Sequence, residues 1–244
     1  MSNPGFKMFD PNNQTQEHIL QGEPMTINGT IQITAFMGLI LLACAALVWS
    51  KVFAGYTDIA NMLTYGGAIV GFILAMIISF KRVKFLVPVY AAAEGLFIGG
   101  LSAYFEAMFP GIVMQAVAGT FAALFSMLIL YRIGLIKCTD KFRSVIFIST
   151  ASVAVIYLVN FIGHFFGYSV PLIHTSSTFG IIFSLVVIAI AALNLIIDFD
   201  FIEKGQSMML PKDYEWFGAF GLMVTLAWLY VEILKLLAKL NSRD

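Results

Sequence analysis

Seven long apolar runs constrain the fold of this chain more than any other feature. A helix needs about 20 apolar residues to cross the hydrocarbon core of a bilayer. None of the runs alternates with a period of two, so they favour helices over the strands of a membrane barrel. The sequence therefore predicts an all-α integral membrane protein. The runs cover residues 31–49, 62–80, 85–109, 112–131, 145–166, 179–197 and 216–240, and we expect the sixth helix to continue to residue 203.

The composition excludes most soluble classes of protein. Of the 244 residues, 60% are apolar and only 11% are charged, whereas a soluble domain carries about 25% charged residues. A water-soluble enzyme, a nucleic-acid-binding protein and a disordered chain are therefore ruled out. The net charge of zero offers no basic patch for a polyanion. Cys44 and Cys138 lie far apart, with neither a disulfide framework nor a metal-binding spacing.

The chain divides into a polar N-terminal segment, residues 1–25, and one transmembrane domain, residues 26–244. Ten of the 14 Lys and Arg residues fall on the N-terminal side of the expected membrane. The positive-inside rule then places the N-terminus in the cytoplasm and the C-terminus outside. We expect the polar segment to lie in the cytoplasm.

Acidic side chains within apolar helices are the candidate functional residues, because a charge at mid-bilayer costs at least about 2.5 kcal/mol. At about 1.5 Å per residue, Glu94 lies roughly 14 Å deep, near the midplane, and level with Thr225. Glu232 lies roughly 24 Å deep, in the outer half. Asp198 and Asp200 sit at the cytoplasmic end of the sixth helix. Such acids hold a proton, share one, bind a cation or face water.

Each of these acids also has a structural interpretation. Glu94 precedes Gly95 and Gly99, a small-residue pair that favours close helix packing, so its carboxyl could be a buried structural hydrogen-bond group. Glu232 could pair with Lys235 or Lys239 on roughly the same helix face. Asp198 and Asp200 could be ordinary loop acids. Two further side chains, Asn160 and Asn194, are expected to form hydrogen bonds between helices.

The end of the sixth helix and the last helix carry a family resemblance. The run IDFDFIEKG at 197–205 is followed by FGAFGLMVTLAWLYVEILKLL from Phe217. Together they resemble the transmembrane Bax inhibitor motif family, including its bacterial YccA-like members. The Glu94-Gly95-Leu96 start within the third helix is also similar to some bacterial members.

The resemblance implies a fold and a mechanism. It implies seven helices, with the last one central and wrapped by the other six, in a bacterial inner membrane. It also implies a slow, pH-sensitive calcium leak, sensed by one carboxylate at the end of helix six and another in helix seven. Asp198 matches the first position and is the candidate calcium site. An ungapped match puts Thr225 at the second, and Glu232 would match only with a shift of seven residues, which moves it about 10 Å outward.

Several functions remain open from the sequence. The first is a proton-modulated calcium leak with Asp198 as sensor and cation site, Asp200 and Glu94 as assistants, and Thr225 or Glu232 as lining. The second is a non-transporting regulator that binds a membrane protease or another membrane protein, through the polar segment and helix surfaces. A retinal protein and a membrane hydrolase are disfavoured, since no deep lysine in the last helix and no hydrolase motif is present. We expect no enzymatic activity, no cofactor and a monomer in the lipid bilayer.

Overall fold

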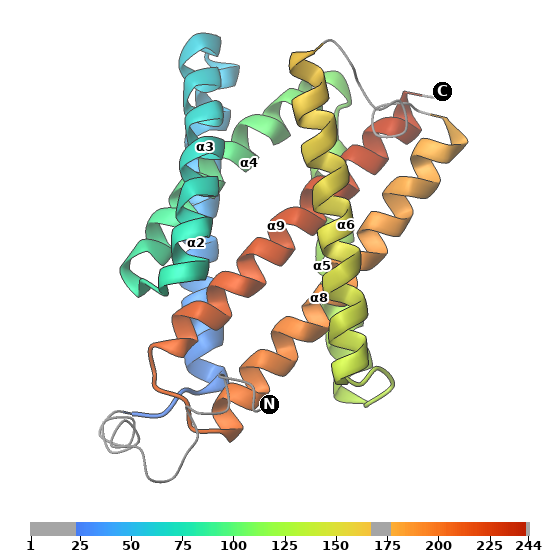
Figure 1. Ribbon diagram of the computed structural model, residues 1–244. Helices are drawn as coiled ribbons and strands as arrows, with labels where there is room; N and C mark the ends of the chain where they lie inside the picture. Colours follow the sequence, from blue (N-terminus) through green and yellow to red (C-terminus); the bar gives the residue numbers. More distant parts are fainter. Residues whose placement is uncertain (1–22, 167–176, 243–244) are drawn as a thin grey trace.

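The computed structural model describes residues 23–166 and 177–242, and in these ranges it is built from helices (Figure 1). Seven of them are long and apolar enough to cross a membrane, as the sequence predicts. Many large apolar side chains on their outer surfaces are exposed, as contact with lipid requires. The seven helices are α2 (Ile27–Phe53), α3 (Thr57–Lys81), α4 (Val87–Met108), α5 (Ile112–Arg132), α6 (Asp140–Phe165), α8 (Thr178–Ser207) and α9 (Tyr214–Asn241).

Local chemistry sets where the helices begin. Thr26 caps α2 by accepting a hydrogen bond from the Gly29 N–H at 2.9 Å, so the helix starts four residues before the apolar run. Glu106 accepts hydrogen bonds from the N–H groups of Gly111 and Val113, at 2.7 and 3.1 Å, and so satisfies the start of α5. Gly111 itself has φ +87°, a backbone conformation that favours glycine.

Helix α9 is the centre of the packing. It crosses the molecule between α2, α3 and α4 on one side and α5, α6 and α8 on the other (Figure 1). It packs against α2, α4, α5 and α8, while α3 packs mainly on α4 and α6 mainly on α8. Over its most apolar stretch 56% of α9 is buried, against 11% for α6. This arrangement does not confirm that all six other helices wrap α9.

Glycines allow α2 and α4 to pack at close range. A β-carbon on Gly95 or Gly99 would collide with the backbone of Leu41 or Ala45 in α2. The pair therefore forms the small-residue packing face that the sequence predicts. This contact fixes α4 against α2, and Ile98, which lies between the two glycines in the sequence, packs in a cluster with Tyr230 and Leu234 of α9.

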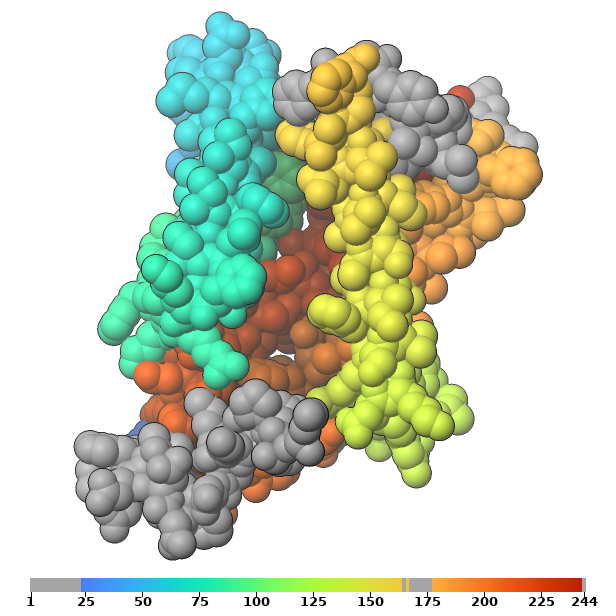
Figure 2. Space-filling view, viewed as in Figure 1, coloured from blue at the N-terminus to red at the C-terminus, as the bar shows by residue number. Residues whose placement is uncertain are grey.

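A hollow lies between α3 and α6 on the face shown in Figure 2, with α9 visible at its floor. The two helices on its rim belong to opposite sides of the molecule in Figure 1. Because α6 packs mainly on α8, it forms one wall of this hollow without closing it. Asp198, Asp200 and Glu232, which are described below, lie on α8 and α9, and the last two contact α6.

Candidate functional site

Asp198 lies in the last third of α8, which continues without interruption to Ser207. The sequence-based placement of Asp198 at the end of this helix is therefore wrong, because the helix runs about two turns further beyond it than the apolar run indicates. Its Oδ2 atom is buried and has no hydrogen-bond partner among the residues that the structure describes. Its Oδ1 atom faces Gly221 of α9, where a β-carbon would lie 3.3 Å away. An unpaired buried carboxyl oxygen costs free energy comparable to a lost hydrogen bond, or much more if it is charged. Asp198 is therefore the polar group with the least compensation in the described fold.

Thr225 is the polar neighbour of Asp198 across the α8–α9 interface. It is buried, and it lies one helical turn beyond Gly221 on the same side of α9. The carboxyl of Asp198 thus faces a neutral hydroxyl group. The structure brings together the two positions that the resemblance paired, one held by an acid and the other by threonine.

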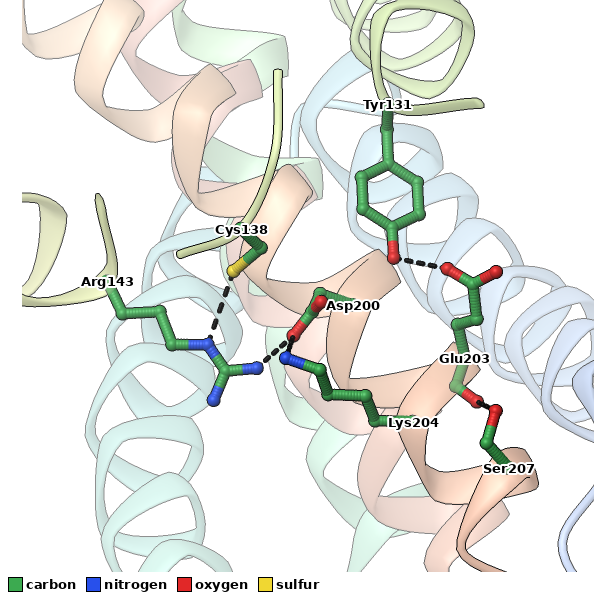
Figure 3. A network of polar contacts seen from close by, with 7 residues as sticks. All are labelled: Tyr131, Cys138, Arg143, Asp200, Glu203, Lys204 and Ser207. Carbon is green, nitrogen blue, oxygen red and sulfur yellow. Dashed lines mark hydrogen bonds and ion pairs between the residues drawn. The ribbon is translucent and has the colours of Figure 1, made fainter. Parts of the chain in front are cut away.

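Asp200 has a different environment from Asp198, although only one residue separates them. It is buried and accepts ion-paired hydrogen bonds from Arg143 of α6 and Lys204 of its own helix, the latter at 2.9 Å (Figure 3). A helix turns by about 100° per residue, so residues two apart point to opposite sides. Asp200 joins α8 to the start of α6 and does not assist Asp198 directly.

The same network extends to the neighbouring loop and helix. Cys138 accepts a hydrogen bond from Arg143 Nε at 3.2 Å, and Tyr131 donates one to Glu203 (Figure 3). Burial is the largest influence on the Cys138 thiol and raises its pKa above the ordinary value, although the hydrogen bond from Arg143 works against it. These contacts fasten the α5–α6 connection to the end of α8.

Glu94 is held at a different interface. Its carboxylate lies over Gly71 of α3, where a β-carbon would be 3.4 Å from Oε2, and it interacts with Tyr90 one turn earlier in α4. Within the part of the chain that the structure describes, its side-chain partner is Tyr90, whereas that of Asp198 is Thr225. Tyr90 packs edge-on against Phe220 of α9, the residue next to Gly221. The rings of Tyr90 and Phe220 thus connect the surroundings of Glu94 with the part of α9 that faces Asp198.

Glu232 is almost fully buried and is paired. Both carboxylate oxygens lie within hydrogen-bond distance of the Tyr157 hydroxyl of α6, at 3.0 and 2.9 Å, and Oε1 also accepts from Lys235 Nζ at 2.9 Å. The predicted pair with Lys235 is confirmed. Lys239 instead donates to the Gly180 carbonyl and the Ser184 hydroxyl of α8, at 3.1 and 2.8 Å.

Sequence reasoning missed Glu215 at the start of α9. This buried carboxylate accepts hydrogen bonds from both the N–H and the hydroxyl of Thr26, each at 2.9 Å. The residues before α2 continue this contact as an antiparallel bridge between Pro24 and Pro211. Met25 is buried against Gly205. Glu215 is the last residue of the polar connection between the sixth and seventh apolar runs. No pattern in the sequence therefore predicted that its side chain is buried.

An ion pair lies next to the bridge between Pro24 and Pro211. Lys212 pairs with Glu23, and the pair lowers the pKa of the Glu23 carboxyl and raises that of the Lys212 ammonium group. Both side chains are exposed. The pair therefore adds little to stability, because solvent screens it.

The described residues hold no group of three or more His, Cys, Asp or Glu side chains that could bind a metal ion. Asp198 with Thr225 offers only two side chains, whereas Ca²⁺ takes six to eight oxygen ligands. A cation at Asp198 would keep much of its water.

Comparison with known protein families assigns the chain as a whole. The sequence model of the family described as Bax inhibitor 1 like matches residues 3–242. The chain belongs to the Bax inhibitor 1-like family. No curated protein matches it. This Bax inhibitor 1-like chain thus combines the seven-helix membrane fold with an acid in the last third of α8 and a threonine of α9 facing it.

Proposed function

We propose that this protein is a pH-sensitive calcium (cation) leak channel, gated by protonation of Asp198 in the last third of α8. One observation carries the proposal, namely that Asp198 Oδ2 is buried at the α8–α9 interface without a partner among the described residues. In its neutral form the carboxyl group is tolerated there. In its ionised form it needs a partner, which a cation or water would supply.

The surroundings of Asp198 fit a gate that depends on this change. Gly221 and Thr225 leave the carboxyl facing a small, neutral stretch of α9. Hydration of the ionised carboxyl would have to separate α8 from α9 at that level. Asp200 holds the end of α8 to α6 while this happens, because its charge is already neutralised by Arg143 and Lys204. Glu94 then supports the α3–α4 interface and is not a cation ligand.

Family membership and the distribution of charge support the rest of the proposal. We place the protein in a bacterial inner (plasma) membrane as a monomer, with its N-terminus in the cytoplasm and its C-terminus outside. The ion pairs and hydrogen bonds of Arg82, Lys84 and Lys212 gather around the α8–α9 connection, on the side assigned to the cytoplasm. Calcium is the cargo in this scheme, and no resident cofactor or enzymatic reaction is part of it.

The test is calcium entry into liposomes that contain the purified protein, measured from about pH 6 to about pH 8. Wild type is compared with D198N and with D58N, which removes an exposed acid at the start of α3. We expect a pH-dependent flux in wild type and D58N, and a flux that no longer depends on pH in D198N. Flux equal to that of empty liposomes at every pH would overturn the channel and favour a regulator that binds a membrane protease or another membrane protein.

A further inference from the structure

A line of polar side chains on α6, α8 and α9 runs from Thr225, near the middle of α9, to Lys239 in the last turn of that helix. Thr225, Glu232 and Lys239 are spaced seven residues apart and share one face of α9. We call this line the polar seam. Its members are Asp198, Asn194 and Ser184 of α8, Thr150 and Tyr157 of α6, and Thr225, Glu232, Lys235 and Lys239 of α9.

Close contacts join the members of the polar seam across helices at four levels, the last of which is the hydrogen bond from Lys239 to the Ser184 hydroxyl at 2.8 Å. Asp198 faces Thr225 at the first level. Asn194 donates a hydrogen bond to the Thr150 hydroxyl at 2.9 Å at the second. Tyr157 reaches Glu232 at the third. Seven residues of helix separate Thr225 from Glu232, so the two acids of the seam lie about 10 Å apart along the axis of α9.

Glu232 is the second carboxylate of the polar seam. Together with Tyr157 it surrounds the Lys235 ammonium group much as a binding site surrounds a cation. The Lys235 ammonium group lies 2.9 Å from Glu232 Oε1 and 4.7 Å from the centroid of the Tyr157 ring. A carboxylate oxygen and the face of an aromatic ring are two groups that attract a monovalent cation. With one carboxylate only, the cluster matches a single positive charge and lacks the oxygen ligands that Ca²⁺ needs.

The two members of this ion pair differ in exposure. The Glu232 side chain is 2% exposed, whereas the Lys235 side chain is 35% exposed. The carboxylate is therefore fixed inside the fold, and the lysine reaches it from the edge on a flexible four-carbon chain. Removing the lysine would leave a buried charge whose hydrogen-bond partner among the described residues is the Tyr157 phenol, with the Lys239 ammonium group acting on it from further along α9. That charge would favour any small cation that could enter.

We propose that Glu232 and Tyr157 form a second, monovalent cation site in the polar seam, and that Lys235 fills this site as a tethered cation. This inference rests on the proposed function, because it assigns the seam as the path and Lys235 as the group that restrains flux through it. A group on a short tether competes at a high effective concentration. A free cation must displace Lys235 before it passes Glu232, so the leak is slow.

Flux through four variants tests the restraint. K235A removes the tethered charge, K235R retains it, and K235A with E232Q removes both partners. K51A serves as a control, because it removes a lysine near the end of α2 that does not contact the seam. We expect sodium flux in K235A to rise about tenfold, equivalent to about 1.4 kcal/mol, with K235R and K51A close to wild type. Unchanged sodium flux in K235A would overturn the restraint.

A second measurement tests the site without using flux. In detergent, K235A should unfold at a lower temperature than wild type, and added ethylammonium or sodium ions should raise that temperature again. Neither ion should have this effect on the E232Q/K235A double variant or on wild type. A K235A protein whose unfolding temperature is indifferent to both ions would contradict a cation site at Glu232.

The two measurements separate failure of this inference from failure of the proposed function. Ion-dependent stabilisation of K235A together with no flux in any variant would support the site and overturn the channel. A pH-dependent wild-type flux that is lost in D198N, with a K235A variant that gains neither flux nor ion-dependent stability, would support the channel and overturn the tethered cation. Loss of both signals would overturn both.

Discussion

Gly221 of α9 lies directly against the Asp198 carboxyl, and a β-carbon at this position would stand 3.3 Å from Oδ1. That distance is shorter than ordinary van der Waals contact, so the carboxyl has to move when a methyl group is added. Gly221 therefore limits the space around the Asp198 carboxyl group.

Gly221→Ala should alter the pH response more than it alters stability. Alanine gains up to about 1 kcal/mol of helix propensity over glycine, which offsets part of the crowding. We expect the G221A protein to fold, with its free energy of unfolding within about 1 kcal/mol of wild type, and to show a displaced pH dependence of calcium flux. A pH profile superimposable on that of wild type would show that Asp198 is not confined at this point.

Two glycines of α2 offer a matched test of the contact between α2 and α9. A β-carbon on Gly29 would collide with the Glu215 carboxylate, whereas one on Gly38 would meet nothing within 4 Å. G29A should therefore lower the free energy of unfolding by about 1–3 kcal/mol, the usual cost of overpacking. G38A should leave it equal or slightly higher. Thermal unfolding in detergent measures both, and equal values for the two variants would refute the buried Glu215 contact.

Asp200→Asn should weaken the fold without removing pH sensing. It leaves Arg143 and Lys204 without their carboxylate, but these side chains are 39% and 46% exposed and water can solvate them. We expect a loss of about 1–3 kcal/mol, less than the cost of breaking a fully buried pair. Calcium flux in D200N should keep its dependence on pH. If D200N abolishes that dependence as D198N is expected to do, the two acids act together.

Cys138 reports both the orientation of the protein and the burial of its thiol. The raised pKa keeps this thiol protonated, so fewer thiolates are present near neutral pH than in a free cysteine. Alkylation of Cys138 in a C44S background should be slower than that of a small thiol and should accelerate as the pH rises. A membrane-impermeant maleimide should label it only from the cytoplasmic side. Labelling from the outside would reverse the assigned topology.

The apolar runs were enough to predict the seven helices, because crossing a bilayer demands length and hydrophobicity more than it demands particular contacts. The close approach of Gly95 and Gly99 and the pair of Glu232 with Lys235 were also predictable. These features depend on spacing within a single helix. The facing of Asp198 and Thr225 came from the family resemblance and not from the spacing of the residues.

The remaining contacts depend on how each helix is rotated, which no local pattern specifies. Tyr157 lies 75 positions from Glu232, and Thr26 lies 189 from Glu215. The residues around either partner form no pattern that predicts the other partner. Glu94 shows the reverse case, since its depth in the sequence suggested a partner for Asp198, while the rotation of α4 directs it toward Gly71 of α3.

The proposed function depends on one claim, that the proton on the Asp198 carboxyl controls the flux of cations through the protein. Infrared difference spectroscopy tests this claim most directly. The C=O stretch of a protonated carboxyl is recorded in membranes as the pH is changed, in wild type and D198N, alongside calcium flux from the same preparation. We predict a carboxyl band that changes over the same pH interval as the flux and that is missing from D198N. A flux that changes with pH while the Asp198 band stays constant would contradict the account.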